Sequence, residues 1–540
     1  MSALRFRLRT ATMIALGVAA LVSSRASAQT GRPRSLAEAR LQVAGADGAG
    51  PVRRLSIDDA VRLALEENLG IRIQRIDPQI QDVNVALARS FWAPSLSTSF
   101  SRNTQSQRST SALSGGATSV DNGTFGNGLG VNQVLPWGGT YAANWSNQRV
   151  TTTNLFSNFS PQLLSTVAFN FTQPLLRNFK IDQIREQVQL SAKARDLSDI
   201  QLKTVIAQTT RNVRNAYWDL ATARNNLAAQ NQSLELAQRS LRDNQRRVDV
   251  GTMAPIDIIQ AQAEVAINEQ QVIVAEAAIK SAEDRLRALV FDPDTANFWN
   301  TTIEPTDAPP FQEQPIDLDA AVRNALDKRS DVSQAKNGLE QNDVAIRFFR
   351  NQILPDVSAA VDYRSIGIGG VQLSSVDPFA IATGVVPERT IVADRGFGST
   401  LGEALQSAYP NWTFSVSIGY PLGASTAQAN LARARLQHQQ AEAQLKNVRL
   451  QVVAQVREVG RQVQTNQQRV KSARASRELQ EKKLDAEEKK QAAGMSTSFF
   501  VFQAQRDLAQ ARTQEIQAIS DYNKALVDFD AVQEVPLIGR

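Results

Sequence analysis

The chain has 540 residues, no cysteine and one histidine, and 21% of its residues are charged. The absence of cysteine excludes disulfides, thiolate nucleophiles, cysteine-ligated zinc and a lipid-anchored cysteine. The formal net charge is +6, but four arginines and no acid lie within residues 1–28, so the remainder carries 55 basic against 53 acidic side chains, a balance without the electrostatic footprint of nucleic-acid binding.

Residues 1–28 have the three parts of a secretory signal peptide. Arginines near the N-terminus precede an apolar run at 11–22, and Ala-Ser-Ala at 26–28 forms a small-residue cleavage site. The run is too short to cross a bilayer, which takes about 20 residues. An uncleaved anchor helix is the alternative. Residues 29–54, rich in Gly, Ala, Arg and Ser, are expected to form a flexible N-terminal segment.

The sequence after this segment is duplicated. SIDDAVRLAL at 56–65 recurs as DLDAAVRNAL at 317–326, and a Gly turn followed by Gln-Ala-Gln occurs at Gly251 and again at Gly494. A unit this long is a whole domain copied once, not a short solenoid repeat. We expect one repeat at 55–313, a second at 314–535, and a C-terminal tail at 536–540.

Four segments alternate apolar and polar residues in the manner of transmembrane β-strands. They are Ser95–Ser101, Thr166–Thr172, Val357–Arg364 and Asn411–Tyr420. This pattern predicts two strands per repeat and four in the chain, too few for a barrel, since the smallest bacterial barrels have about eight. Either several chains share one barrel, or the strands pack as an ordinary sandwich.

Gly-rich polar segments surround these strands. Residues 106–126 and 365–406 are expected to be outer loops of the barrel. The first repeat also contains an extra candidate hairpin, Leu129–Trp145, which turns at Leu135–Gly139. This hairpin either joins the barrel wall or lies against it.

The longest predicted elements are helices. Residues 181–250 contain neither Gly nor Pro, and as one helix they would extend about 105 Å. Apolar residues recur there every seven positions, the period of a coiled coil, and again at 258–286 after a break at Gly251–Pro255. Each repeat is therefore expected to hold a long antiparallel helical hairpin that packs laterally against copies of itself. A solvated structural coiled coil is the alternative.

The sequence resembles the TolC family of outer-membrane efflux proteins over nearly its whole length after residue 28. The resemblance rests on the paired openings LSIDDAVRLALEEN and IDLDAAVRNALDKR, the strand-to-helix corner QPLLRNF at 173–179, and the tips VDVGTMAPIDIIQAQAEV and GMSTSFFVFQAQRDLAQA. It implies an α+β membrane protein, with a duplicated strand pair and long coiled-coil hairpin. Three chains would form a 12-stranded outer-membrane β-barrel, continued by a periplasmic α-helical tunnel.

The resemblance also implies a function in export. The homotrimer would sit in outer-membrane lipid and give substrates a passive conduit to the exterior. Substrates would come from an inner-membrane pump through a periplasmic adaptor protein, in a tripartite efflux pump or in type I secretion. The rival hypothesis is a periplasmic coiled-coil scaffold or adaptor without a pore.

The two helical turns are the expected adaptor-docking sites, because they lie furthest from the barrel and their small residues permit close approach of a partner. The predicted docking residues are Gly251, Thr252, Met253, Gly494, Met495 and Ser496.

The tunnel mouth departs from the pattern of the family that the chain resembles. Many members carry acids six and nine residues after the second tip glycine, and these acids form rings that narrow the tunnel. Here Phe500 and Gln503 occupy those positions, whereas the first tip keeps an acid at Asp257. A ring of Phe could close the pore by dewetting. The alternative is that Phe499, Phe500 and Phe502 only pack between neighbouring tips.

Nothing in the sequence suggests an enzyme, a metal site or a bound cofactor. The lone His438 lies in a predicted helix and has no second imidazole or thiolate to assist it. We expect it to be a solvated helix residue. Transport energy would therefore have to come from the partner pump.

Overall fold

A computed structural model describes residues 52–109, 118–294, 298–377, 379, 388–423 and 425–534. The predicted signal peptide at 1–28 and tail at 536–540 lie outside these residues, as does most of the segment 29–54. Val52–Leu55 forms strand β1, which pairs in parallel with β6 (Thr302–Pro305). The prediction of a flexible segment is therefore wrong for residues 52–54.

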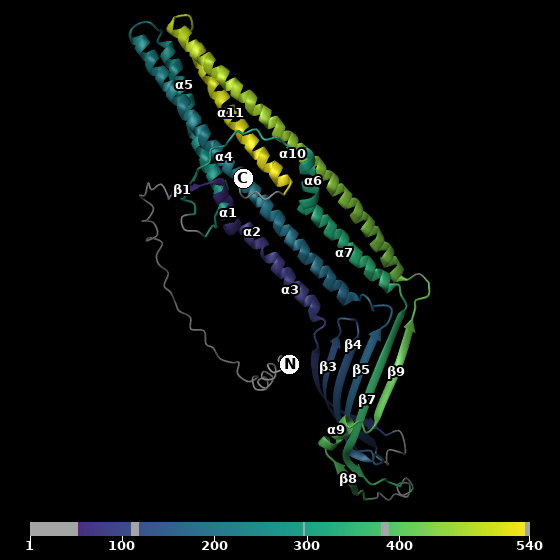
Figure 1. The fold of residues 1–540 in the computed structure, drawn as a ribbon. Helices are drawn as coiled ribbons and strands as arrows, with labels where there is room; N and C mark the ends of the chain where they lie inside the picture. The colour runs from purple at the N-terminus through teal and green to yellow at the C-terminus, as the bar shows by residue number, and fades with distance from the viewer. Residues whose placement is uncertain are drawn as a thin grey trace, which may run out of the picture. The chain divides into compact units, whose positions relative to one another are not determined.

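The described chain combines long helices with one large sheet (Figure 1). The helices are α1 (Ile57–Glu67), α2 (Leu69–Gln74), α3 (Ile76–Ser90), α4 (Gln183–Asp249), α5 (Ile256–Val290), α6 (Leu318–Lys328), α7 (Ser330–Gln352), α9 (Phe397–Leu405), α10 (Thr426–Ala492) and α11 (Ser498–Val532). The strands of the large sheet are β2 (Ser95–Arg108), β3 (Ser119–Val134), β4 (Thr140–Thr152), β5 (Phe159–Pro174), β7 (Asp356–Leu373), β8 (Ile391–Arg395) and β9 (Pro410–Gly419).

The predicted helical hairpins are present in both halves. Helix α4 and helix α10 each have 67 residues, and the returning helices α5 and α11 each have 35. Asp182 caps α4 by accepting a hydrogen bond from the Arg185 amide, and Ser425 caps α10 by accepting one from Gln428. Equal helix lengths in the same order are what a duplicated domain predicts.

Small apolar clusters hold the helices together along their length. Tyr217 of α4 is buried with Leu220 and with Leu286 of α5 in the largest cluster. Its hydroxyl lies 3.1 Å from the carbonyl oxygen of Leu55 and 2.9 Å from a carboxylate oxygen of Asp307. Burial raises the pKa of Tyr217 to about 12. The heptad positions Leu220 and Leu286 thus face a packed interior, and the buried polar group is hydrogen-bonded, as stability requires.

The sheet has more strands than predicted. Its order is β2-β3-β4-β5-β7-β8, and β9 pairs with the first half of β7. All these strands lie in one sheet, so the sandwich alternative is wrong for the described residues. The prediction of four strands is also wrong, because this sheet contains six long strands and the short β8 among the described residues. The extra hairpin joins the wall, since β3 and β4 lie between β2 and β5.

The two predicted outer loops are correspondingly shorter than expected. Most of 106–126 belongs to β2 and β3, and 365–406 contains the end of β7 together with β8 and α9. The turn at Leu135–Gly139 is confirmed: the amide of Leu135 donates to Gly139 and that of Gly138 donates to Leu135.

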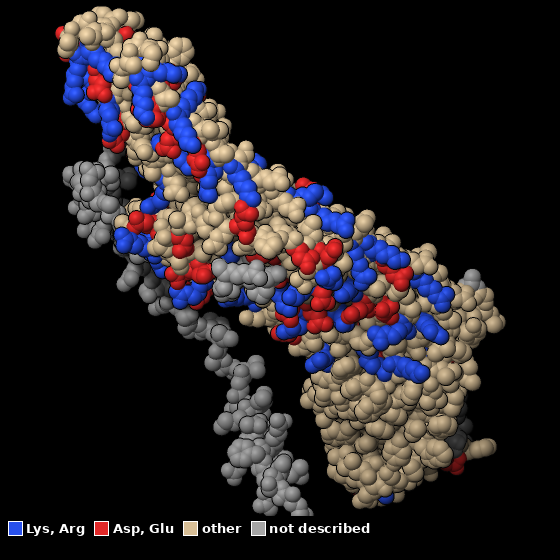
Figure 2. Space-filling view, turned by 45° about the horizontal axis from the view of Figure 1, so that its top comes forward, with Lys and Arg blue, Asp and Glu red and all other residues tan. Residues whose placement is uncertain are grey.

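The sheet has one apolar and one polar face, because residues paired across antiparallel strands share a face. The apolar face carries Leu96, Phe100, Leu129, Val131, Trp145, Phe169, Phe171, Val361, Tyr363, Trp412 and Phe414. The polar face carries Ser97, Ser99, Gly128, Gly130, Asn144, Asn170, Asp362, Thr413 and Ser415. Figure 2 shows few charged side chains on the sheet and many on the helices. The alternation typical of a membrane strand is therefore present in all six long strands.

Candidate functional site

The first helical tip ends in a glycine that has the left-handed conformation, with φ +78° at Gly251. Its amide donates to Val248 at 2.9 Å, and the Thr252 amide donates to Arg247 at 2.8 Å. These two bonds form a Schellman motif, which satisfies the last carbonyls of α4. A side chain at Gly251 would meet no atom within 4 Å, so the site needs glycine for its backbone only.

The second tip repeats this geometry. Gly494 has φ +74°, its amide donates to Gln491 at 3.1 Å, and the Met495 amide donates to Lys490 at 2.8 Å. Met495 is 75% exposed. Both predicted tips are therefore rigidly capped turns with little around them.

The structure brings the two tips together. The Ser498 hydroxyl lies 3.8 Å from the sulfur of Met253, and the tips lie side by side at the end of the helices remote from the sheet (Figure 1). Ser496 donates to Glu487 at 2.9 Å. Hydrogen bonds from Lys490 and then Ser496 lower the pKa of Glu487, so this tip keeps a negative charge near neutral pH.

The predicted gate residues lie in the first turns after the tips, Asp257 in α5 and the others in α11. Phe500 is 55% exposed and contacts Phe499 edge to face, with ring centroids 5.6 Å apart. Phe502 is buried. Phe502 therefore packs inside its own chain, while Phe500 is free to meet a neighbouring copy. Its role as a gate stays a prediction.

A charged network surrounds Gln503. Its side-chain amide donates to Asp507 at 2.8 Å, and its oxygen accepts from Arg506 at 3.0 Å. The Lys483 ammonium donates to the same Asp507 carboxylate at 2.8 Å, and this bond lowers the pKa of Asp507. Gln503 is thereby held in one orientation beside an ionised carboxylate.

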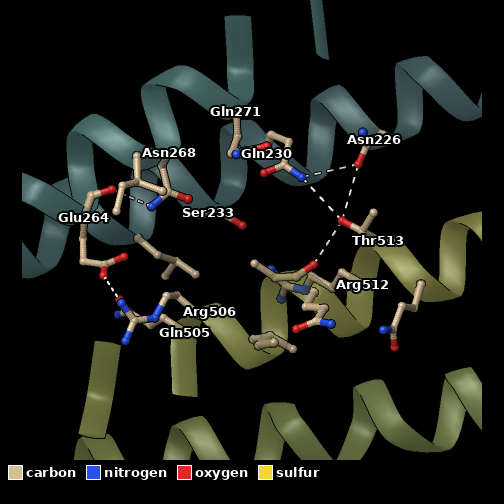
Figure 3. A pocket seen from close by; sticks show the side chains of 16 residues that line it. Asn226, Gln230, Ser233, Glu264, Asn268, Gln271, Gln505, Arg506, Arg512 and Thr513 are labelled. Carbon is tan, nitrogen blue, oxygen red and sulfur yellow. Dashed lines mark hydrogen bonds and ion pairs between the residues drawn. The ribbon is translucent and has the colours of Figure 1, made fainter. Parts of the chain in front are cut away.

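A polar groove of about 530 Å³ lies between the two hairpins and is lined by residues of α4, α5 and α11. Arg506 of α11 contacts Glu264 of α5 at 2.6 Å, and Gln505 donates to Ser240 of α4 at 2.9 Å. Figure 3 shows that Thr513 faces α4 across the same groove. Polar contacts therefore join the hairpins at this level. The sequence pattern did not predict them.

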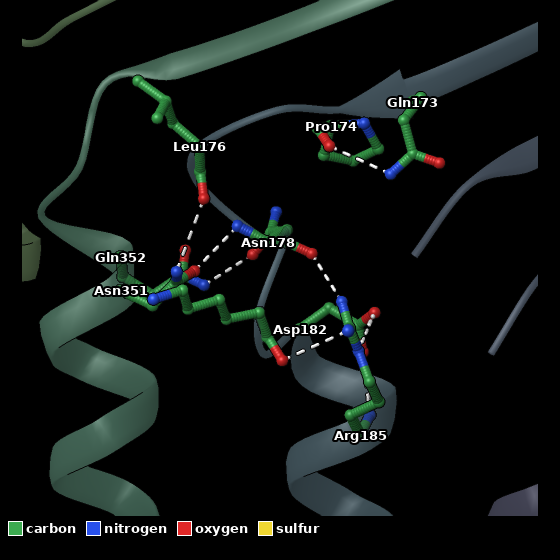
Figure 4. Close-up of polar contacts among 9 residues, drawn as sticks. Gln173, Pro174, Leu176, Asn178, Asp182, Arg185, Asn351 and Gln352 are labelled. Atoms are coloured by element: carbon green, nitrogen blue, oxygen red, sulfur yellow. Dashed lines mark hydrogen bonds and ion pairs between the residues drawn. The ribbon is translucent and has the colours of Figure 1, made fainter. Parts of the chain in front are cut away.

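A second polar cluster joins the sheet to the helices at the corner 173–179 (Figure 4). Asn178 has φ +65°, a conformation that Asn tolerates better than most residues. Its amide donates to the Asn351 side chain at 2.7 Å, and its side chain accepts from Gln352 at 2.6 Å. Arg185 donates to the Asn178 carbonyl at 2.6 Å. The corner thus ties the start of α4 to the end of α7.

The β3–β4 turn packs on this corner. A side chain at Gly138, where φ is +91°, would come within 2.7 Å of the Arg185 guanidinium and 2.9 Å of the Asn178 carbonyl. The turn therefore lies at the helix end of the sheet, and only glycine fits there.

The lone histidine is not simply solvated. Nε2 of His438 lies 3.0 Å from a carboxylate oxygen of Asp343, which links α10 to α7. The prediction of a solvated residue is therefore wrong. No cluster of His, Asp or Glu suited to a metal ion occurs among the described residues. None of the described helices has the length and apolar character needed to cross a membrane.

Comparisons with known proteins agree on one family. The family model for outer membrane efflux protein matches residues 138–290 and 321–532, more than half of the chain. A search of curated protein sequences gave no match.

Solved structures share the fold at low identity. The CmeC outer membrane channel of Campylobacter jejuni has a TM-score of 0.59 and 14% identity, over 88% of this chain and 85% of that chain. The outer membrane protein VceC of Vibrio cholerae has a TM-score of 0.59 and 14% identity, over 88% of this chain and 96% of that chain. The MtrE outer membrane channel of Neisseria gonorrhoeae has a TM-score of 0.59 and 14% identity, over 88% of each chain. Together with the duplicated hairpins and the two-faced sheet, the family match shows that this chain belongs to the outer membrane efflux protein family and acts as an efflux channel in the outer membrane.

Proposed function

We propose that three copies of this chain close their sheets into one outer-membrane barrel and their helices into one periplasmic tunnel. The observation that carries the proposal is the two-faced sheet, whose edge strands β2 and β9 lack a partner on one side among the described strands. Within a bilayer an open sheet edge is too costly, because lipid cannot bond its amides and carbonyls. The apolar face suits lipid and the polar face suits a water-filled lumen.

Strand direction supports closure between copies. Neighbouring long strands are antiparallel throughout, so β2 runs away from the helices and β9 runs back toward them. A β9 edge placed beside the β2 edge of the next copy would therefore continue the alternation. Because the β3–β4 hairpin adds two strands at once, its insertion leaves these directions unchanged.

We therefore revise the size of the barrel. The 12-stranded barrel rests on four strands per chain, whereas three copies of six long strands supply 18. With strands about 4.8 Å apart and tilted by about 40°, the backbone cylinder would widen from roughly 24 Å to roughly 36 Å across. A barrel of this size leaves room for an aqueous channel.

The helical tips are the proposed contact with the energy-supplying machinery. The two turns lie at the far end from the sheet, and exposed small residues there allow a partner helix to approach closely. Substrates would pass from an inner-membrane pump through a periplasmic adaptor into the tunnel, in efflux or in type I secretion. The two-faced sheet favours this channel over a soluble scaffold or adaptor.

The experiment is to purify the protein in detergent, measure its mass, and view it end-on by electron cryomicroscopy. We expect a trimer with a ring of roughly 36 Å that conducts ions in planar bilayers. A folded monomer that leaves the cell envelope without detergent would contradict the channel. A trimer with a ring of roughly 24 Å would contradict only the larger barrel.

A further inference from the structure

Helix α9 packs directly on one face of the sheet, near the end remote from the long helices (Figure 1). Two glycines of β7 make the contact possible. A side chain at Gly367 would lie 1.9 Å from the backbone oxygen of Thr400, and one at Gly369 would lie 2.2 Å from the Thr400 hydroxyl oxygen. Thr400 and Ala404 are buried against the sheet.

The face that α9 covers is the apolar one. Gly367 and Gly369 share the face of Tyr363, since all are odd-numbered residues of one regularly paired stretch. Tyr363 in turn pairs with Trp412 of β9. The Tyr363 hydroxyl also donates to the Ser407 hydroxyl just after α9. The helix therefore lies on the side of the wall that carries the exposed aromatic residues.

Helix α9 begins where the apolar run of the strands ends. Along β7 this face changes from Val361 and Tyr363 to Ser365 and glycine, and on β5 it changes from Val167 to Ser165, which pairs with Gly367. Both serines have no exposed surface. Tyr409 and Trp412, both more than 60% exposed, lie at this level. Aromatic residues at such a boundary are typical of a membrane–water interface.

The outer surface of α9 carries no free charge. Glu403 is its only charged residue; its carboxylate contacts Arg395 at 2.6 Å and accepts from the Ile368 amide at 3.3 Å. Leu405 is 64% exposed and Phe397 is 39% exposed. A helix with a closed ion pair and exposed Leu and Phe suits the boundary between headgroups and acyl chains.

We propose that α9 is an interfacial helix that contacts lipid of the outer leaflet through Phe397 and Leu405. It would fix the depth of the barrel in the membrane. The inference rests on the proposed function, because it requires the apolar face of the sheet to point outward.

The absence of cysteine allows a direct test. Single variants Phe397→Cys and Leu405→Cys are labelled with a nitroxide and reconstituted into vesicles of phosphatidylethanolamine and phosphatidylglycerol. Collisions with oxygen report lipid, and collisions with a water-soluble nickel chelate report solvent. Phe414→Cys on the apolar face and Ser417→Cys on the polar face are the matched controls.

We expect collisions with oxygen to dominate for labels at 397, 405 and 414, and collisions with the nickel chelate to dominate at 417. If the nickel chelate dominates at 405 while oxygen dominates at 414, the inference about α9 is wrong and the proposed channel stands. A label at 405 that neither reagent reaches would also overturn it, since another protein segment would then cover α9. If the nickel chelate dominates at 414 and oxygen dominates at 417, the apolar face of the sheet does not point toward lipid, and the proposed function is wrong as well.

As a second test, Gly367→Val should push α9 from the sheet and abolish the oxygen preference at 405. Gly398→Ala should leave that preference intact, because the site is open. An unchanged preference in Gly367→Val would contradict the docking of α9 on the glycines.

Discussion

Replacement of Gly251 by alanine isolates the energetic contribution of one backbone conformation. An L-residue held at φ +78° costs about 1–2 kcal/mol, and no clash adds to this cost because nothing lies within 4 Å of the new carbon. We therefore expect the first tip to open about 5–30 times more often. The effect should stay local, since long-range packing along α4 is untouched.

Hydrogen exchange on the detergent-solubilised protein measures this opening at the amides of Gly251 and Thr252. Gly251→Asn should exchange more slowly than Gly251→Ala, because Asn visits the left-handed region more readily. Gly338→Ala, at an open position in the middle of α7, is the control and should not accelerate tip exchange. Equal exchange in the Ala variant and the wild type would refute the reasoning. If the tips dock an adaptor, a bulky residue at 251 should also abolish export while trimers remain in the membrane.

Three further outcomes are expected. In planar bilayers, divalent cations on the periplasmic side should block Phe500→Asp more strongly than the wild type; strong block of both channels alike would rule out the apolar gate. Arg506→Ala should lower the free energy of unfolding by about 1–3 kcal/mol, because Glu264 stays buried without its partner. Thermal melts followed by helical circular dichroism that coincide with those of the wild type would contradict this. The pKa of Asp507 is lowered, chiefly by the hydrogen bond from Lys483, so the stability that this carboxylate contributes is complete above its ordinary pKa of 3.8 and is lost as the pH falls through the lower folded pKa. Asp507→Asn should therefore lose less stability on acidification than the wild type. Acid melts of the variant that match those of the wild type would refute this expectation.

The helices could be predicted from sequence because their signals are local. The absence of Gly and Pro at 181–250, the heptad spacing and the tip glycines act within a few turns of one helix. Strand β3 was predicted only in part, because the candidate hairpin covered its second half and the loop 106–126 covered most of its first half. Phe125, Leu129 and Val131 alternate with glycines, but the glycines suggested a loop. A side chain at Gly126 would lie 2.9 Å from the Ser101 hydroxyl oxygen on β2, so one of the two would have to move.

The polar contacts between elements could not be predicted in this way. Arg506 and Glu264 are separated by 242 residues, and Asn178 and Asn351 by 173. No periodic pattern connects positions so far apart. The packing of α9 on the sheet could not be predicted for the same reason, because it depends on contact between the backbone of Thr400 and Gly367.

The position of the β3–β4 turn has a consequence for flow through the channel. Six long strands reach the helix end of the sheet, but only four continue into helices, because the turn at Leu135–Gly139 joins the other two. In the proposed trimer the barrel wall would therefore widen while the ring of helices beneath it keeps its circumference. Two conduits in series have a total resistance dominated by the narrower one. The rate of export would then be set in the helical tunnel, and sequence changes in the added hairpin would alter the exit without slowing the cargo.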